Sequence, residues 1–167
     1  MRYGKIIVVL ALLAPALAAC ATSGGMTVGS GAIANPSPKY RNAIAVRAVR
    51  GGQLMDMRTV PGVANEPFKA ALEATLSANG YLAASGAAKF HLDVEIQNLH
   101  QPMTGFNLAA TADVTYHISG AGPAASYPVR TKGTATFSDS PIAVDRIRIA
   151  SERAMRENIG QFLQVLR

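Results

Sequence analysis

Three segments in the second half of the chain alternate between apolar and polar side chains, and this alternation constrains the fold most strongly. They span residues 89–97, 108–118 and 127–137. In the first segment the apolar side chains are Phe90, Leu92, Val94 and Ile96. A period of two residues predicts β-strands with one face against a core and the other in water. We therefore expect a sheet that helices cover on one side only.

A strand and a helix are expected before these three strands. Residues 43–49 form a short run with β-branched members that ends at Gly51-Gly52, which predicts a buried first strand. Asn65 offers a helix N-cap, and apolar residues then recur at helical spacing. Asn79-Gly80 offers a left-handed stop, so the predicted helix lies between these two points.

One long amphipathic helix is expected near the end of the chain. It is predicted to open at Ser140-Pro141 and to run to about Leu166, with one broad apolar stripe. The element order is therefore strand, helix, three strands, helix. This order predicts an α+β fold: a two-layer sandwich, β-α-β-β-β-α, with a four-stranded mixed sheet and two helices on one face.

The same order places the connections at two ends of the predicted sheet. A single crossover helix makes the first two strands parallel, and each hairpin then reverses the chain direction. The connections at 51–64, 99–106 and 138–141 are therefore expected to lie together at one end. The segment before residue 40 is expected to leave the domain from the opposite end.

The first nineteen residues have the layout of a secretory signal peptide. Arg2 and Lys5 form a basic region. Residues 6–17 form an apolar core that is shorter than a membrane-spanning helix of ~20 residues. We therefore expect residues 1–19 to be a signal that is removed on export.

The end of this signal carries the only cysteine of the chain, in Leu17-Ala18-Ala19-Cys20. The tetrapeptide resembles the lipobox of bacterial lipoproteins at all four positions. That resemblance implies cleavage between Ala19 and Cys20, lipidation of Cys20 and attachment to a membrane through acyl chains. Ala21, in place of an aspartate, implies the outer membrane, facing the periplasm. The alternative is an ordinary secreted protein with a chance cysteine.

Residues 20–39 are small, polar and rich in glycine and serine, and they end in Asn35-Pro36-Ser37-Pro38. This composition predicts a flexible tether between the lipid and a single domain over residues 40–167. Leaving Arg2 and Lys5 out of the 16 basic residues gives 14, against 10 acidic ones, a net charge of +4. So mild a charge suits an anionic membrane surface and argues against a nucleic-acid partner.

The layout resembles that of small proteobacterial outer-membrane lipoproteins, with the lipopolysaccharide-assembly lipoprotein as the best understood family. The resemblance covers the lipobox and the βαβββα order over residues 43–166. It includes a last helix that is entered through a Ser/Pro turn after Ala135-Thr136-Phe137. Residues 68–72 and 144–150 are similar to short lipoproteins of unknown function. The assembly family implies a role in stabilising a β-barrel and contacting lipopolysaccharide.

Motifs for catalysis or for a cofactor are not evident, so we expect a non-catalytic protein without a cofactor. The chain has no G-x-S-x-G, H-E-x-x-H or G-x-x-x-x-G-K motif. His91, Asp93, Asp113 and His117 lie on the predicted wet face and have side chains that can ligate a metal. Alternation alone also explains all four residues, and we predict no metal site.

Two surfaces are candidates for contacts with partners. Arg146, Arg153 and Arg156 are predicted on the outer face of the last helix, either for lipid phosphates or as a solvated surface with glutamate partners. The connections at 51–64 and 99–106 carry large apolar side chains that either contact an envelope protein or close the core. The candidate contact residues are Leu54, Met55, Met57, Met103 and Phe106.

Together these features predict a membrane-anchored periplasmic lipoprotein that acts as an envelope assembly, scaffold or transport accessory protein. The alternative is a lipid- or glycan-binding module that uses the open face of the sheet. Contact with lipid or lipopolysaccharide is compatible with either function.

Overall fold

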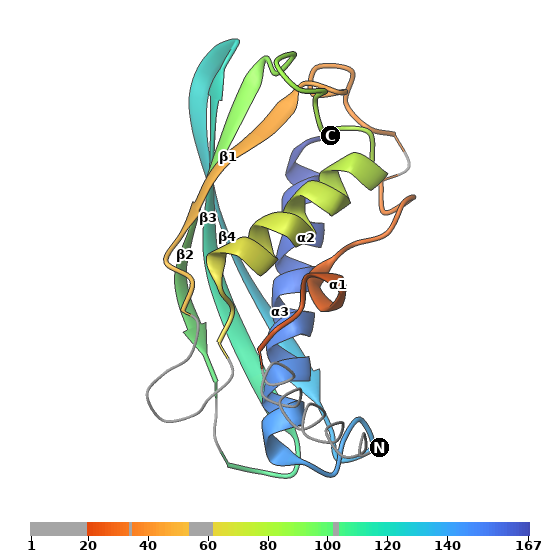
Figure 1. The fold of residues 1–167 in the computed structure, drawn as a ribbon, viewed down its shortest axis with the longest axis vertical. Coiled ribbons are helices and arrows are strands. Elements are labelled where there is room, and N and C mark those ends of the chain that lie inside the picture. Colours follow the sequence, from red (N-terminus) through yellow and green to blue (C-terminus); the bar gives the residue numbers. More distant parts are fainter. Residues whose placement is uncertain (1–19, 34, 54–61, 102–103) are drawn as a thin grey trace, which may run out of the picture.

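A four-stranded sheet with helices on one face forms the framework of the domain (Figure 1). The computed structural model describes residues 20–33, 35–53, 62–101 and 104–167. The elements are α1 Ser23–Met26, β1 Ile44–Arg50, α2 Asn65–Ala78, β2 Phe90–His100, β3 Leu108–Gly120, β4 Gly122–Ala135 and α3 Ala143–Val165. The predicted α+β fold and its β-α-β-β-β-α order are confirmed, with the short helix α1 added before β1.

The sheet has the order β1-β2-β3-β4, with β1 parallel to β2 and the other neighbours antiparallel. Leu92 on β2 lies between Val46 on β1 and Ile118 on β3. A register shift between Ile96 and Asn98 lets β2 continue to His100, beyond the predicted strand end. Such a bulge breaks the alternation, and for that reason residues 98–100 resemble a loop in the sequence.

The alternation of β2 divides its side chains between core and solvent as predicted. Leu92 and Val94 are buried beneath the helices, whereas His91 and Glu95 are exposed on the other face. α2 and α3 both pack on the apolar face (Figure 1). The largest fully buried side chains include Tyr81, Tyr116, Phe68, Phe162, Leu72, Leu76 and Leu92.

The helix α3 lies very close to β4 at Gly133. A Cβ atom at this position would overlap with the backbone of Ala150 and Ala154, so only glycine fits. Asn158 interrupts the apolar stripe of α3 and is fully buried in the same helix. Its amide group donates to the Val129 carbonyl at 2.9 Å. The interrupted stripe therefore marks the close contact between helix and sheet.

Both long helices begin differently from the prediction. Asn65 lies inside the first turn of α2, and Ala64 is the N-cap residue. The Asn65 Oδ1 atom accepts a hydrogen bond from the Gly52 backbone at 2.8 Å, so it fixes the loop instead of the helix. α3 begins after Ile142, without a side-chain cap. Ser140 binds the Ile142 amide and stabilises the turn before the helix.

The segment after Cys20 is packed against the domain, which corrects the expected tether. Ala21, Met26 and Ile33 are only 3%, 0% and 6% exposed and belong to the hydrophobic core. The helix α1 contacts α2 and α3 on the side away from the sheet (Figure 1). Met26 and Ile33 are large apolar side chains in a segment of small residues, and their burial orders it. The folded domain therefore begins well before residue 40.

Candidate functional site

The end of the domain that contains Cys20 brings together the features that the sequence singled out. We call it the Cys20 end and define it by Cys20, residues 62–63, residues 104–107 between β2 and β3, and residues 136–144 from the end of β4 into the first turn of α3. The Ala21 amide donates to the Gly62 carbonyl at 3.4 Å, which places Cys20 beside the entry to α2. Residues 42–43 lie at the opposite end, as expected, beside Gly80 and Tyr81, but the segment before them runs back along the helices and brings Cys20 to this end.

Thr22 fixes the chain two residues after Cys20. Its amide and its hydroxyl both donate to the Oε1 atom of Glu152, at 2.8 and 3.1 Å. Glu152 is buried on α3, and Arg148 binds both of its carboxylate oxygens at 3.1 and 3.2 Å. Because its charge has a partner on the same helix, this carboxylate can be buried and still accept from Thr22.

The short helix α1 is held on α3 by further contacts. Thr22 caps α1 by accepting from the Gly25 amide at 3.1 Å. A side chain on Gly25 would overlap with the Glu152 carboxylate, and the Arg156 guanidinium donates to the Gly25 carbonyl. The Val28 amide donates to the Thr75 hydroxyl of α2 at 2.9 Å. Cys20, itself half-buried, is therefore followed by a segment that is bonded to both long helices.

Exposed apolar side chains gather at the Cys20 end. Phe106 is 83% exposed, Phe137 57% and Ile142 59%, and Val144 in the first turn of α3 is 41% exposed. Phe106 was predicted as a contact residue, whereas the other three were not singled out. Leu54, Met55, Met57 and Met103 lie outside the described residues, as do the expected signal peptide and Ala19.

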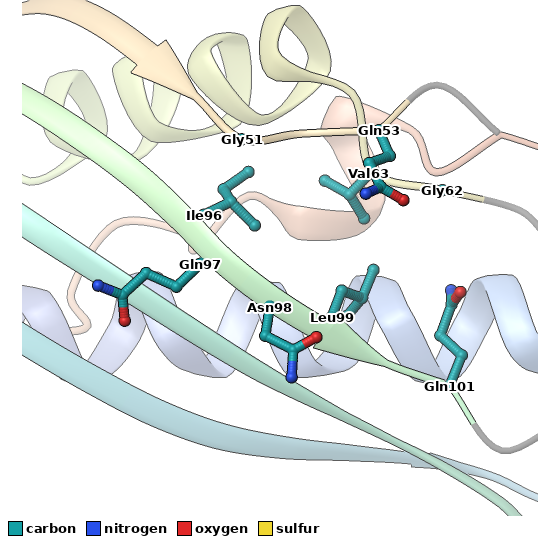
Figure 2. Close-up of a pocket in the computed structure, with 9 residues that line it drawn as sticks. All are labelled: Gly51, Gln53, Gly62, Val63, Ile96, Gln97, Asn98, Leu99 and Gln101. Atoms are coloured by element: carbon teal, nitrogen blue, oxygen red, sulfur yellow. The ribbon is translucent and has the colours of Figure 1, made fainter. Parts of the chain in front are cut away.

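A small pocket opens beside the Cys20 end, between the end of β1, the second half of β2 and residues 62–63 (Figure 2). Its volume is about 110 Å³. The side chains at its wall are those of Gln53, Val63, Ile96, Gln97, Asn98, Leu99 and Gln101. Sites for small molecules usually have roughly 300–1,000 Å³. Its amides can bind water or a backbone group, and none of these side chains is acidic or basic.

The predicted wet face of the sheet holds pairs of charged residues. Arg47 binds Asp93 through both carboxylate oxygens, and this hydrogen bonding lowers the pKa of Asp93. Arg130 lies 3.4 Å from Asp113, measured between Nε and Oδ1. The His117 Nδ1 atom lies 2.7 Å from the Ser126 hydroxyl. Among the described residues no group of three or more such side chains is placed to hold a metal ion.

The arginines of α3 serve the fold of the Cys20 end and do not form a free basic surface. Arg146 is buried and donates to the carbonyls of Ser140 and Pro141 at 2.8 and 3.0 Å. Its guanidinium also lies 5.4 Å from the centre of the Phe137 ring. These contacts hold residues 137–141 against the start of α3, a role that the sequence pattern did not reveal.

Arg153 fixes the same connection from further along α3. It donates to the Thr134 carbonyl at 2.7 Å and to both oxygens of Asp139, at 2.7 and 3.0 Å. Hydrogen bonds from Arg153 and from the Thr136 amide hold the pKa of Asp139 well below its usual range. The expected glutamate partners are thus replaced by Asp139 for Arg153 and by a backbone carbonyl for Arg156.

The fold recurs in solved structures of bacterial proteins. No family model matches the chain, and no curated protein matches its sequence. A DUF330-family protein from Xanthomonas campestris has a TM-score of 0.51 at 12% identity, covering 77% of this chain and 86% of that chain. A candidate lipoprotein from Caulobacter crescentus has a TM-score of 0.52 at 14% identity, covering 77% and 90%. Such similarity shows a common fold and does not confirm the resemblance to the lipopolysaccharide-assembly lipoprotein.

Proposed function

We propose that this chain is a non-catalytic lipoprotein of the bacterial envelope, anchored through acyl chains on Cys20. The observation that carries the proposal is the junction at Cys20, where the lipobox ends and the next residue, Ala21, is already buried in the domain. A residue at such a junction can carry lipid while the domain stays folded behind it. None of the described helices is long and apolar enough to cross a bilayer.

We propose a role as an assembly, scaffold or transport accessory protein, because many polar groups of the domain bind one another. Two pairs of charged residues on the sheet face bind each other, Arg47 with Asp93 and Arg130 with Asp113. The arginines of α3 hold the Cys20 end together. The side chains that remain exposed and apolar are suited to contact with a membrane or another protein. We assign the protein to the outer membrane, because Ala21 follows Cys20 where retained lipoproteins have an aspartate.

The experiment is expression of the full chain in a Gram-negative host that is fed an alkyne analogue of palmitate. We expect label on the wild type, a mature product that begins at Cys20, and sedimentation with outer membranes in a density gradient. Cys20→Ser is expected to lose the label and to leave either the precursor or a soluble product. Thr27→Ser, a conservative change inside the packed segment, is the matched control and keeps both label and location.

A normal product size and membrane attachment in Cys20→Ser would refute the lipid anchor. If the wild type carries the palmitate label but sediments with the inner membrane, the proposed lipidation stands and only the assignment to the outer membrane is refuted. The two results separate the chemistry at Cys20 from the sorting that follows it.

The alternative of a lipid- or glycan-binding module rests on a hollow on the sheet face. It has a volume of about 390 Å³, and its side chains include Arg47, Arg50, Glu95 and His117. Arg50 and His117 offer donors to an anionic sugar or headgroup. Titration of the protein with lipopolysaccharide tests this function, with Arg50→Ala against Lys69→Ala on α2. Equal binding by both variants would remove the sheet face as a site.

A further inference from the structure

Large exposed apolar side chains in the described part of the chain are concentrated at one end. Of the five, Phe106, Phe137, Ile142 and Val144 lie at the Cys20 end, and only Val165 lies at the other end of α3. The pairing of Leu108 with Ala135 sets the two connections that carry Phe106 and Phe137 next to each other. The connection between β2 and β3 and the connection between β4 and α3 therefore lie at the same end of the domain (Figure 1).

The chain leaves almost no slack between Cys20 and the domain. A free tether of nineteen residues would reach a root-mean-square distance of roughly 24 Å. Here Ala21 is bonded to Gly62 and Thr22 to Glu152, so only two peptide units separate Cys20 from a fixed point. Two residues span at most about 7 Å. Lipid on Cys20 would bring this end of the domain to the bilayer surface.

We propose that the Cys20 end docks on the lipid bilayer, with Phe106, Phe137, Ile142 and Val144 entering the boundary between headgroups and acyl chains. The inference rests on the proposed lipidation of Cys20 and adds an orientation to it. The domain stands with the long helices and the strands pointing away from the membrane. The turn between β3 and β4 and the end of α3 then face the periplasm.

The charges at this end are compatible with contact with lipid. Asp139 is bonded to Arg153, Arg146 to the carbonyls of Ser140 and Pro141, and Asp145 accepts from the Ser140 hydroxyl at 3.2 Å. The Arg146 guanidinium stacks over Phe137, an arrangement that keeps a cation beside an apolar ring at an interface. Because these charges have partners within the domain, docking depends on apolar contact and changes little with salt concentration.

A second copy of the chain or a protein partner could cover the same side chains. The short link to Cys20 favours lipid, because it holds these side chains near the bilayer whenever the anchor is inserted. An extended tether would leave the choice open. The observation that selects the bilayer is therefore the pair of bonds at Ala21 and Thr22.

The test uses tryptophan, which the chain lacks. Phe106→Trp and Ile142→Trp each place one fluorescent reporter at the Cys20 end, and Val165→Trp is the control at the other end of α3. All three positions are exposed, so the larger ring is accommodated. The full lipidated proteins are reconstituted in vesicles of phosphatidylethanolamine and phosphatidylglycerol, with and without brominated acyl chains.

We expect brominated lipid to quench the reporters at 106 and 142 and to leave the reporter at 165 unquenched, at low and at high salt. If brominated lipid leaves the emission of all three variants unchanged, while the protein still floats with the vesicles, the docking is overturned and lipidation stays intact. Protein that carries no acyl chain and fails to float would refute the proposed function, and the docking with it. Quenching that disappears at high salt would refute apolar insertion.

Discussion

The Thr22 amide and hydroxyl both donate to one oxygen of Glu152, across 130 positions of sequence. Two donors on one buried carboxylate fix the direction in which the chain leaves Cys20. Arg148 binds the same carboxylate from the preceding turn of α3, so the acceptor has a cationic partner. One side chain of the last helix therefore accepts two of the hydrogen bonds that attach the N-terminal segment.

Glu152→Ala is expected to release residues 21–33 from α3 and leave the sheet folded. Hydrogen bonds to a charged acceptor contribute about 2 kcal/mol each, and the variant loses both bonds to Thr22. Hydrogen exchange is the measurement, with faster exchange expected in peptides from 21–33 and no change in β2. Glu157→Ala, an exposed change on the same helix, is the control. Unchanged protection of Thr22 in Glu152→Ala would contradict this attachment.

Met26→Ala is expected to lower the free energy of unfolding by about 2–5 kcal/mol, as for a buried core residue. Met26 is fully buried between α1 and the long helices, although the sequence around it is rich in glycine and serine. Met26→Leu keeps the volume and is expected to cost less than about 1.5 kcal/mol. Urea unfolding of both variants measures the difference. A neutral Met26→Ala would mean that the segment is a free tether after all.

Asn158→Ala is expected to cost about 3 kcal/mol, because it leaves buried polar groups without partners. The Tyr116 hydroxyl donates to Asn158 Oδ1 at 2.8 Å, and burial raises the pKa of Tyr116 well above its ordinary value. Tyr116→Phe removes that donor, so the double variant is expected to cost less than the sum of the two single changes. Additive costs in urea unfolding would show that the two side chains are not coupled.

Asp139→Asn is expected to make the stability of the protein less sensitive to acid. Arg153 holds the pKa of Asp139 below its usual value, so the carboxylate stabilises the folded state above the unfolded pKa of about 4. This contribution is lost as the pH falls below that value toward the folded pKa. The gap in the free energy of unfolding between wild type and variant is therefore expected to shrink below about pH 4.

The comparison for this prediction is Arg153→Ala with and without Asp139→Asn, measured by urea unfolding across the same pH range. At neutral pH the double variant is expected to lose less free energy of unfolding than the sum of the two single variants. This difference is expected to fade in acid. Coupling that stays constant down to pH 3 would show that Arg153 does not lower the Asp139 pKa.

The sheet could be predicted because its signal is local and repeated. In β2 the alternation of Phe90, Leu92, Val94 and Ile96 reflects burial under two helices, and the prediction failed only beyond the bulge at Asn98. Gly133 lies in a strand whose alternation was predicted. The sequence does not show that glycine is required there, because the requirement comes from the backbone of α3. Local pattern thus specifies the layers and leaves the contact between them undetermined.

The attachment of residues 20–33 could not be predicted, because it depends on single long-range contacts. Met26 and Ile33 were the available signals, two large apolar residues in a segment of small ones. No period connects them, and composition alone favours a flexible segment. The position of Cys20 follows from long-range contacts of the two residues after it, Ala21 with Gly62 and Thr22 with Glu152.

Thr22 is synthesised 130 residues before its partner Glu152. At roughly 5–20 residues per second, on the order of ten seconds pass between the emergence of the two residues from the ribosome. During that interval Ala21 and Thr22 have no helix α3 to pack against. Once α3 has folded, that neighbourhood closes. On the proposed lipidation, processing at Cys20 is therefore expected before α3 has folded onto this segment.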